Sequence, residues 1–241
     1  MNITLEKFEK FVGRSVKDPY DRFAGVIVGF YSDVDGTISS VGVEGPSGTF
    51  IKYPIEQFEF KGDNIVLIPT WKAEAEAVKK KLNVAKRRIA ALEDLHARGE
   101  IASHAYEQFK KKLENDISRL KEELKEVKKK LNNKLAELSQ QILELERISA
   151  ALKVSYLSGE IGEKTYNHAL SLIKRSLERC NNEKRDIDNE LSELENLETA
   201  PVLPARKIES TPVPVKEEEK EEEEKPVEGE QQPIMVQILE S

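Results

Sequence analysis

The apolar repeat between residues 71 and 198 constrains the fold of this chain more than any other feature. This stretch contains no proline and only three glycines, and its apolar side chains recur at steps of three and four residues. The longest run extends from Tyr106 to Leu152. Steps that average about 3.5 residues keep one stripe facing a partner helix along a left-handed supercoil. The sequence therefore predicts coiled-coil helices over residues 71–198.

Two copies of one short motif interrupt this repeat. Residues 92–106 and 152–166 match at an offset of 60 residues, and each copy contains Gly-Glu-Ile. Gly99 and Gly159 suit the left-handed position that ends a helix, so we expect helix–turn–helix elbows near residues 99–102 and 159–162. The middle helix would be on the order of 80 Å long, and helices over 71–98 and 163–198 can fold back on its two halves. The alternative, in which the elbows straighten and helices pair only between chains, stays open.

Residues 1–70 have the pattern of a small β domain. Short apolar runs, such as 24–31 and 64–68, are separated by turn signals that include Asp35-Gly36 and Gly45-Pro46. About six short strands in so few residues favour a small barrel, because closure removes exposed strand edges. Pro69 should end the last strand, with the first long helix beginning near Trp71.

The overall composition argues against one compact globule and against a disulfide framework. Charged residues make up 34% of the chain and aromatic residues 6%, and there is one cysteine. Cys180 lies on the apolar stripe, where we interpret it as part of the core. The N-terminus lacks the apolar region of a signal peptide, and no stretch approaches the roughly 20 apolar residues of a membrane-spanning helix. A reducing, intracellular setting and at most peripheral membrane contact fit these features.

The C-terminal residues differ in character from the rest. Residues 199–230 are rich in proline and glutamate, which predicts a disordered, self-repelling tether. Residues 231–241 then form an apolar, β-prone segment in which alternate side chains would share one face of a strand added to a partner's sheet edge. The predicted partner-binding residues are Ile234, Met235, Val236, Gln237, Ile238 and Leu239. Alternatively, this segment docks on the chain's own barrel or stays disordered.

Two basic clusters lie seven residues apart in the first predicted helix. Their residues are Lys79, Lys80, Lys81, Lys86, Arg87 and Arg88. We expect them to stack along one helical face, where clustered cations could bind nucleic-acid phosphates or anionic lipid headgroups without reading sequence. The competing interpretation is an ordinary solvated face of a coiled coil. No aromatic residues interleave with the clusters to suggest base stacking.

The sequence offers no catalytic, metal-binding or cofactor-binding residues. His96, His104 and His168 lie beside the two elbows without ligand-like spacing, and no phosphate-binding glycine loop or nucleophile elbow is present. Asp33 and Asp35 resemble part of a calcium loop, but we interpret them as a hairpin turn because the remaining ligands are absent. We therefore expect that the chain is not an enzyme.

Residues 11–18, 21–22, 25–28 and 35–38 are similar to a PRC-barrel pattern. They are followed by the motif Trp71-Lys72-Ala73-Glu74-Ala75, the two Gly-Glu-Ile elbows and the tethered apolar C-terminus. With these features the whole chain resembles the archaeal cell division protein A family of the Cdv system, whose members begin with the PRC-barrel pattern. The order of barrel, coiled coil, acidic tether and terminal strand is the most specific part of the resemblance.

The resemblance implies a non-enzymatic scaffold in the cytoplasm at the mid-cell division site. Members of the family polymerise into filaments, associate with DNA and with the membrane, and recruit the ESCRT-III-like protein CdvB. The family's C-terminal segment inserts as a strand beside the winged-helix domain of CdvB, which assigns that role here to residues 234–239. The second hypothesis is a nucleic-acid-binding architectural protein that uses the basic face of the coil. A ribosome-assembly factor, suggested by the barrel alone, is disfavoured because such factors lack the long coil.

Overall fold

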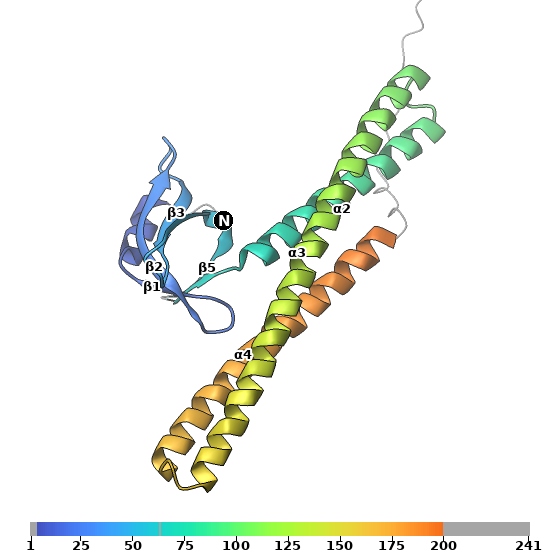
Figure 1. The fold of residues 1–241 in the computed structure, drawn as a ribbon. Coiled ribbons are helices and arrows are strands. Elements are labelled where there is room, and N and C mark those ends of the chain that lie inside the picture. Colours follow the sequence, from blue (N-terminus) through green and yellow to red (C-terminus); the bar gives the residue numbers. More distant parts are fainter. Residues whose placement is uncertain (1–3, 63, 200–241) are drawn as a thin grey trace, which may run out of the picture. The chain divides into compact units, whose positions relative to one another are not determined.

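The computed structural model describes residues 4–62 and 64–199. Over these residues the chain forms a small β domain followed by three long helices (Figure 1). The tether and the partner-binding strand predicted for residues 199–230 and 231–241 lie outside the described residues, apart from Thr199.

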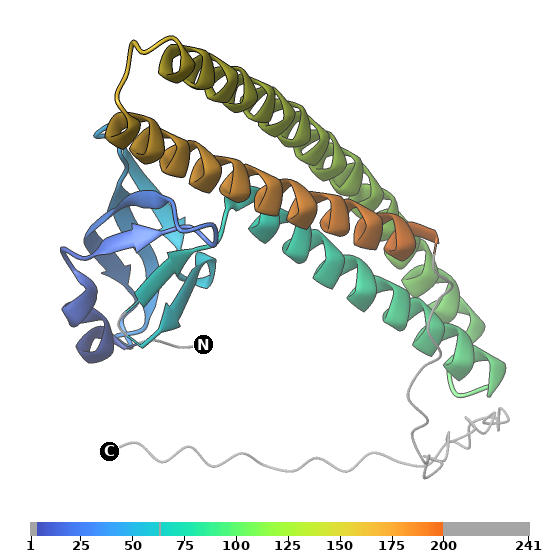
Figure 2. The same ribbon diagram turned by 90° about the horizontal axis from the view of Figure 1, so that it is seen from below.

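The described part of the β domain contains six strands in one sheet. They are β1 (Ser15–Lys17), β2 (Phe23–Ser32), β3 (Ile38–Glu44), β4 (Phe50–Pro54), β5 (Phe58–Lys61) and β6 (Asn64–Leu67). Their order is β4-β3-β2-β1-β6-β5, with β1 and β6 parallel and the other neighbours antiparallel. The sheet is curved (Figure 2).

The prediction of a closed barrel is wrong for the residues that the structure describes. β4 and β5 are the two ends of the strand order, and no ladder joins them. The cause lies in the connection between them: Pro54 has no backbone N–H to donate at the end of β4, and a 3₁₀ helix, η2 (Ile55–Gln57), follows at once. Consecutive strands that would pair in a hairpin are therefore separated at this point.

Two short helices that the sequence did not suggest help to fill the domain. α1 (Leu5–Phe8) and η1 (Glu9–Phe11) contribute the rings of Phe8 and Phe11, which pack edge to face at 5.8 Å between centroids. The buried core of the domain consists of Phe8, Phe11, Val16, Ile27, Ile38, Val41, Val43, Ile55, Phe58, Ile65 and Leu67.

The predicted hairpin turn at Asp33 to Gly36 is confirmed. Gly36 has a positive φ of 76°, a conformation that glycine adopts without steric cost. Asp35 accepts a hydrogen bond from the backbone N–H of Thr37 at 2.9 Å, so its carboxylate is used to shape the turn.

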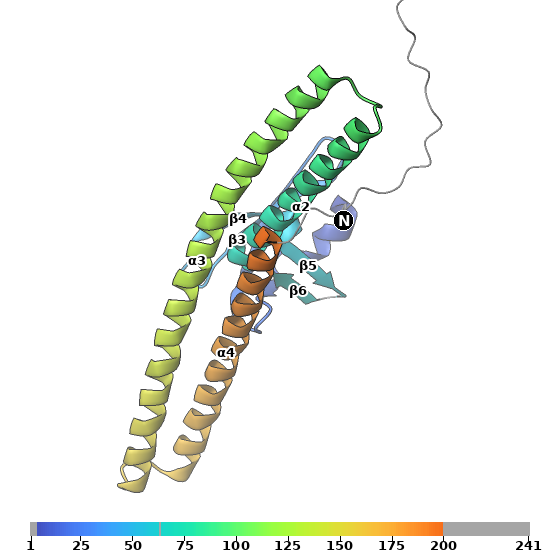
Figure 3. The same ribbon diagram turned by 90° about the vertical axis from the view of Figure 1, so that its right-hand side faces the viewer.

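The three long helices are α2 (Thr70–Ala97), α3 (Ser103–Leu157) and α4 (Glu163–Thr199). α2 packs along the first half of α3 and α4 packs along the second half (Figure 3). The hydrophobic core between them is formed by residues of the predicted apolar stripe: Ala75, Val78, Leu82, Ala85, Leu120, Leu124, Val127, Leu131, Leu138, Cys180, Ile187 and Leu194. Cys180 is in this core, as predicted, and burial raises the pKa of its thiol.

The chain leaves the helical conformation between α2 and α3 and again between α3 and α4, and the two breaks share one geometry. Gly99 and Gly159 have φ values of 71° and 78°. In each break the residue after the glycine donates its N–H five residues back: Glu100 to Leu95 at 3.0 Å, and Glu160 to Ser155 at 2.9 Å. This is the hydrogen bond of a Schellman motif, which satisfies a carbonyl at the helix end.

An aromatic pair closes each break. His96 stacks on Tyr106 with ring centroids 4.0 Å apart, and Tyr156 stacks on Tyr166 at 4.4 Å. The two pairs occupy equivalent positions of the repeat, 60 residues apart. The rings therefore join the end of one helix to the first turn of the next in both copies.

The loop between β1 and β2 contacts α4 through polar groups. Arg22 forms an ion pair with Glu183, whose side chain is only 3% exposed. The hydroxyl of Tyr20 donates to Asp186 at 3.1 Å, and Arg179 donates to the backbone oxygen of Asp21 at 2.7 Å. Burial, together with the charge of Asp186, raises the pKa of Tyr20.

Candidate functional site: the basic residues of helix α2

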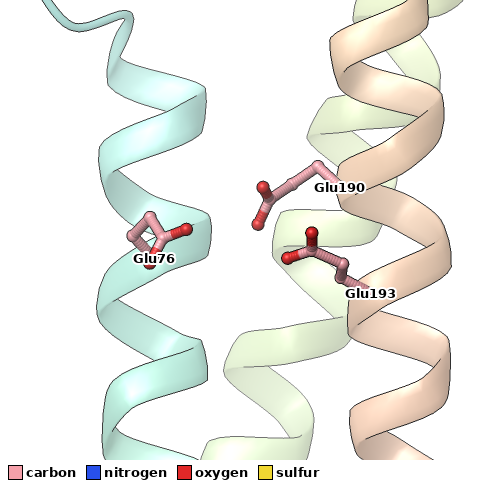
Figure 4. Close-up of side chains that lie close together, drawn as sticks. All are labelled: Glu76, Glu190 and Glu193. Atoms are coloured by element: carbon pink, nitrogen blue, oxygen red, sulfur yellow. The ribbon is translucent and has the colours of Figure 1, made fainter.

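Lys79 lies in a cluster of three carboxylates between α2 and α4. Its Nζ atom is 2.7 Å from a carboxylate oxygen of each of Glu76, Glu190 and Glu193. The three carboxylates converge from the two helices (Figure 4). The Lys79 side chain is 12% exposed and that of Glu190 is 8% exposed, while Glu76 and Glu193 reach solvent. Lys79 is therefore an internal cross-link of the coil.

The electrostatics of this cluster follow from its geometry. Burial opposes the charged form of Lys79, but the three carboxylates outweigh burial and hold the pKa of Lys79 above its usual range. In return, the hydrogen bond and charge of Lys79 hold the pKa of Glu193 below its usual range. Both groups thus stay ionised around neutral pH, as a charge-assisted cluster requires.

The carboxylate cluster is occupied by the ammonium group of Lys79. The oxygens of Glu76, Glu190 and Glu193 lie within 4.8 Å of one another, a spacing that could suit a cation. The Lys79 ammonium already contacts an oxygen of each of the three at 2.7 Å. The positive charge that these carboxylates need comes from the chain itself.

Lys86, seven residues after Lys79, also points toward α4. Its Nζ donates to the backbone oxygen of Leu197 at 2.6 Å. Burial, and the nearby charge of Lys121, lower the pKa of Lys86. Lys79 and Lys86 therefore do not belong to an exposed basic face.

The other four basic residues of the two clusters are exposed. Lys81 pairs with Glu123 of α3 at 3.2 Å, and the Nε of Arg87 donates to the backbone oxygen of Asn83 at 3.3 Å. Lys80 and Arg88 take part in none of the ion pairs between described residues. The structure thus separates the predicted clusters into two inward-facing lysines and four outward-facing cations.

Further lysines on α3 link the helices in the same way as Lys79. Lys130 pairs with Glu74 of α2, and Lys128 pairs with Glu198 of α4, both at 2.7 Å. These pairs lie where the beginning of α2 and the end of α4 both contact the middle of α3. The sequence alone did not predict this role, because the partners are far apart in the chain and no local pattern joins them.

The remaining predicted residues are not gathered into a site. Of the histidines, His96 stacks on Tyr106, and His104 and His168 are exposed on separate helices. The predicted partner-binding residues, 234–239, lie outside the described residues. No helix in the described part of the chain is long and apolar enough to cross a membrane.

A small β domain followed by long antiparallel helices with charged cross-links places this chain among the coiled-coil proteins. The family model described as a CdvA-like coiled-coil domain matches residues 70–223. Cell division protein A of Sulfolobus acidocaldarius is 33% identical over 199 residues, which cover 82% of this chain and 83% of that protein. The chain therefore belongs to the CdvA family of cell-division proteins, and the family predicted from the sequence is confirmed.

Proposed function

We propose that this protein is a non-enzymatic scaffold of archaeal cell division that assembles with itself into filaments and recruits an ESCRT-III-like protein. The observation that supports the proposal is the 33% sequence identity to Cell division protein A, which extends over most of both chains. A role in cell division follows from that match. Assembly and recruitment are the functions that the coil and the C-terminal sequence best support.

Support for the recruitment step comes from the order of residues at the C-terminus. Ile234, Val236 and Ile238 alternate with other residues, so a strand of this sequence presents all three on one face. Such a strand can add to the open sheet edge of a winged-helix domain of the CdvB type, where main-chain hydrogen bonds give affinity and alternate side chains give specificity. The preceding residues, 199–230, supply length between the coil and this segment.

The location that fits this function is the mid-cell division site. DNA and the membrane are the two surfaces on which such a scaffold could act. The exposed cations of α2, which are Lys80, Lys81, Arg87 and Arg88, suit either anionic surface. Any contact of the coil with a membrane would be peripheral or made through a partner.

The recruitment mechanism is tested by deleting residues 226–241 from the full chain and measuring binding to a CdvB winged-helix domain by titration calorimetry. We expect the deletion to abolish binding and to leave self-assembly intact. If binding is retained after the deletion, recruitment through the C-terminal segment is refuted.

Two single substitutions test the strand geometry. Val236→Asp places a charge on the apolar face of the strand and should abolish binding. Gln237→Asp introduces the same charge on the opposite face and should have a much smaller effect. Equal losses from the two variants would contradict strand addition in this register.

A further inference from the structure

The second half of α3 carries an apolar stripe on the side that faces away from α4. Leu138 and Leu145, seven residues apart, pack toward α4 in the core of the coil. Leu143, Ala150 and Leu157 repeat at the same interval but follow five residues later, which is about 140° around the helix. With Arg147 and Val154 they form a line with steps of four and three residues, which we call the back stripe.

The back stripe is exposed over its whole length. Leu143 is 49% exposed, Val154 66% and Leu157 83%. A line of apolar residues with alternating steps of four and three is the seam of a coiled coil, and a contiguous exposed patch of this kind marks an interaction surface. α2 and α4 pack elsewhere on α3, so this seam has no partner among the described residues.

The apolar character of this side of α3 is confined to the second half of the helix. The residues at the equivalent heptad positions between 108 and 133 are polar or charged: Gln108, Lys112, Asn115, Arg119, Glu122, Glu126, Lys129 and Asn133. A solvated surface would show such residues throughout. The change to Leu143, Ala150, Val154 and Leu157 therefore indicates a contact limited to residues 143–157.

We infer that the back stripe pairs with the back stripe of a second copy of this chain, with the two α3 helices antiparallel. Glu146 and Lys153 flank the stripe on one side, seven residues apart. In an antiparallel pair Glu146 of one copy faces Lys153 of the other, and two-fold symmetry makes this contact twice. In a parallel pair the neighbours of Glu146 and Lys153 across the seam would be Ala151 and Ser158, which offer no opposite charge. The charges therefore select the antiparallel orientation.

The same register brings apolar side chains together at the centre of the pair. Leu143 of one copy packs beside Val154 of the other, again twice. Arg147 lies on the stripe near its middle and is paired with Glu144 of its own helix at 3.3 Å. Its long apolar stem can cover Ala150 of the second copy while the guanidinium stays at the edge. A single charged residue within a seam also fixes the register of the helices.

A two-fold contact of this kind closes on itself and gives a dimer. A filament then needs at least one more surface, so the back stripe would supply the dimeric unit. This inference rests on the self-assembly in the proposed function, and it names the surface at which assembly begins.

Sedimentation velocity of the full chain over a range of concentrations tests the inference. We expect Leu143→Gln/Val154→Gln to raise the dissociation constant of the dimer at least about ten-fold, because four apolar side chains per dimer lose their burial. The matched control is Leu172→Gln on α4, since Leu172 is exposed to a similar extent, 47%, but lies off the stripe. That variant should assemble like the wild type.

A charge exchange tests the orientation without touching the apolar residues. Glu146→Lys alone should weaken the dimer, because it places two positive charges opposite each other. Glu146→Lys/Lys153→Glu should restore the association, because the charges match again with their signs reversed. Recovery in the double variant supports the antiparallel pair.

The outcomes separate this surface from self-assembly in general. A wild-type chain that stays monomeric at every concentration overturns self-assembly, and this inference with it. A wild-type chain that assembles while Leu143→Gln/Val154→Gln assembles equally well overturns only the back stripe. Failure of the charge exchange to restore association overturns the antiparallel register.

Discussion

Replacing Lys79 by methionine should destabilise the coil, because it removes the positive charge from the carboxylate cluster and keeps most of the side-chain stem. Breaking a fully buried ion pair by removing one partner costs about 3–5 kcal/mol, whereas an exposed pair contributes about 0–1 kcal/mol. Here Glu190 is 8% exposed, but Glu76 and Glu193 are 45% and 63% exposed. One buried carboxylate and two screened ones lead us to expect a loss of about 2 kcal/mol in the free energy of unfolding.

Urea unfolding followed by circular dichroism at pH 7 measures this loss, and the neighbouring lysine supplies the control. Lys80 is exposed, so Lys80→Met should change the free energy of unfolding by no more than about 0.5 kcal/mol. Lys79→Met/Glu190→Gln should recover a large part of the loss, because the double variant leaves no buried charge unpaired. Equal stabilities of the Lys79→Met and Lys80→Met variants would refute the structural role of Lys79.

The pH dependence of the same loss is a second check. Lys79 lowers the pKa of Glu193, so the stability from this pair is fully present above the unfolded-state pKa of about 4.3. It is lost as the pH falls through the lower pKa of the folded state. Protonation also relieves repulsion among the carboxylates that Lys79→Met leaves behind. The difference in the free energy of unfolding between wild type and variant should therefore decrease as the pH is lowered from 7 to below about 4. A difference that stays constant over this range would contradict the account.

Two further predictions concern the helix breaks and the exposed cations. Gly159→Ala should destabilise the protein by about 1 kcal/mol, because the φ of 78° is strained for alanine although no atom lies within 4 Å of the added Cβ. Thermal unfolding measures this loss of stability. The control is Gly162→Ala, which should cause little change because Gly162 has no positive φ. Replacing Lys80 and Arg88 by glutamine should weaken DNA binding and reduce its salt slope by about 0.9 for each phosphate that the variant no longer neutralises. Fluorescence anisotropy across a salt series measures this slope, and DNA binding that is unchanged would count against the hypothesis of a nucleic-acid-binding coil.

The long helices and their breaks could be predicted because both depend on local patterns. The step of three and four residues is visible in the sequence, and Gly99 and Gly159 meet a conformational requirement that few other residues can meet. The aromatic pairs across the breaks could also have been predicted. Tyr156 stands at the same position of the repeat as His96, and a ring retained at both positions is a signal from which the stacking could have been predicted.

The features that could not be predicted depend on residues distant in sequence or on very short elements. The partners of Lys79 include Glu190, which is 111 residues away, so no local pattern reveals that Lys79 is paired. The seven-residue spacing of Lys79 and Lys86 therefore suggested an exposed basic face. α1 is only four residues long, which is too short for a helical period to appear. The lack of pairing between β4 and β5 depends on how a single proline and one 3₁₀ turn redirect the chain. Strand propensity does not predict such a change of direction.

The two ends of α3 differ in a way that bears on assembly. Burial is concentrated where the beginning of α2 and the end of α4 share the middle of α3, at residues such as Leu124, Leu131 and Ile187. Toward both breaks the buried positions become sparse, so these ends belong to the least stable part of the coil. Only the second end carries an apolar back stripe, and pairing there would stabilise the residues around Leu157 and leave the end near Gly99 as it is. The repeated motif thus forms two similar turns. The residues on the side of α3 that faces away from α4 decide at which of the two ends a second copy can pair.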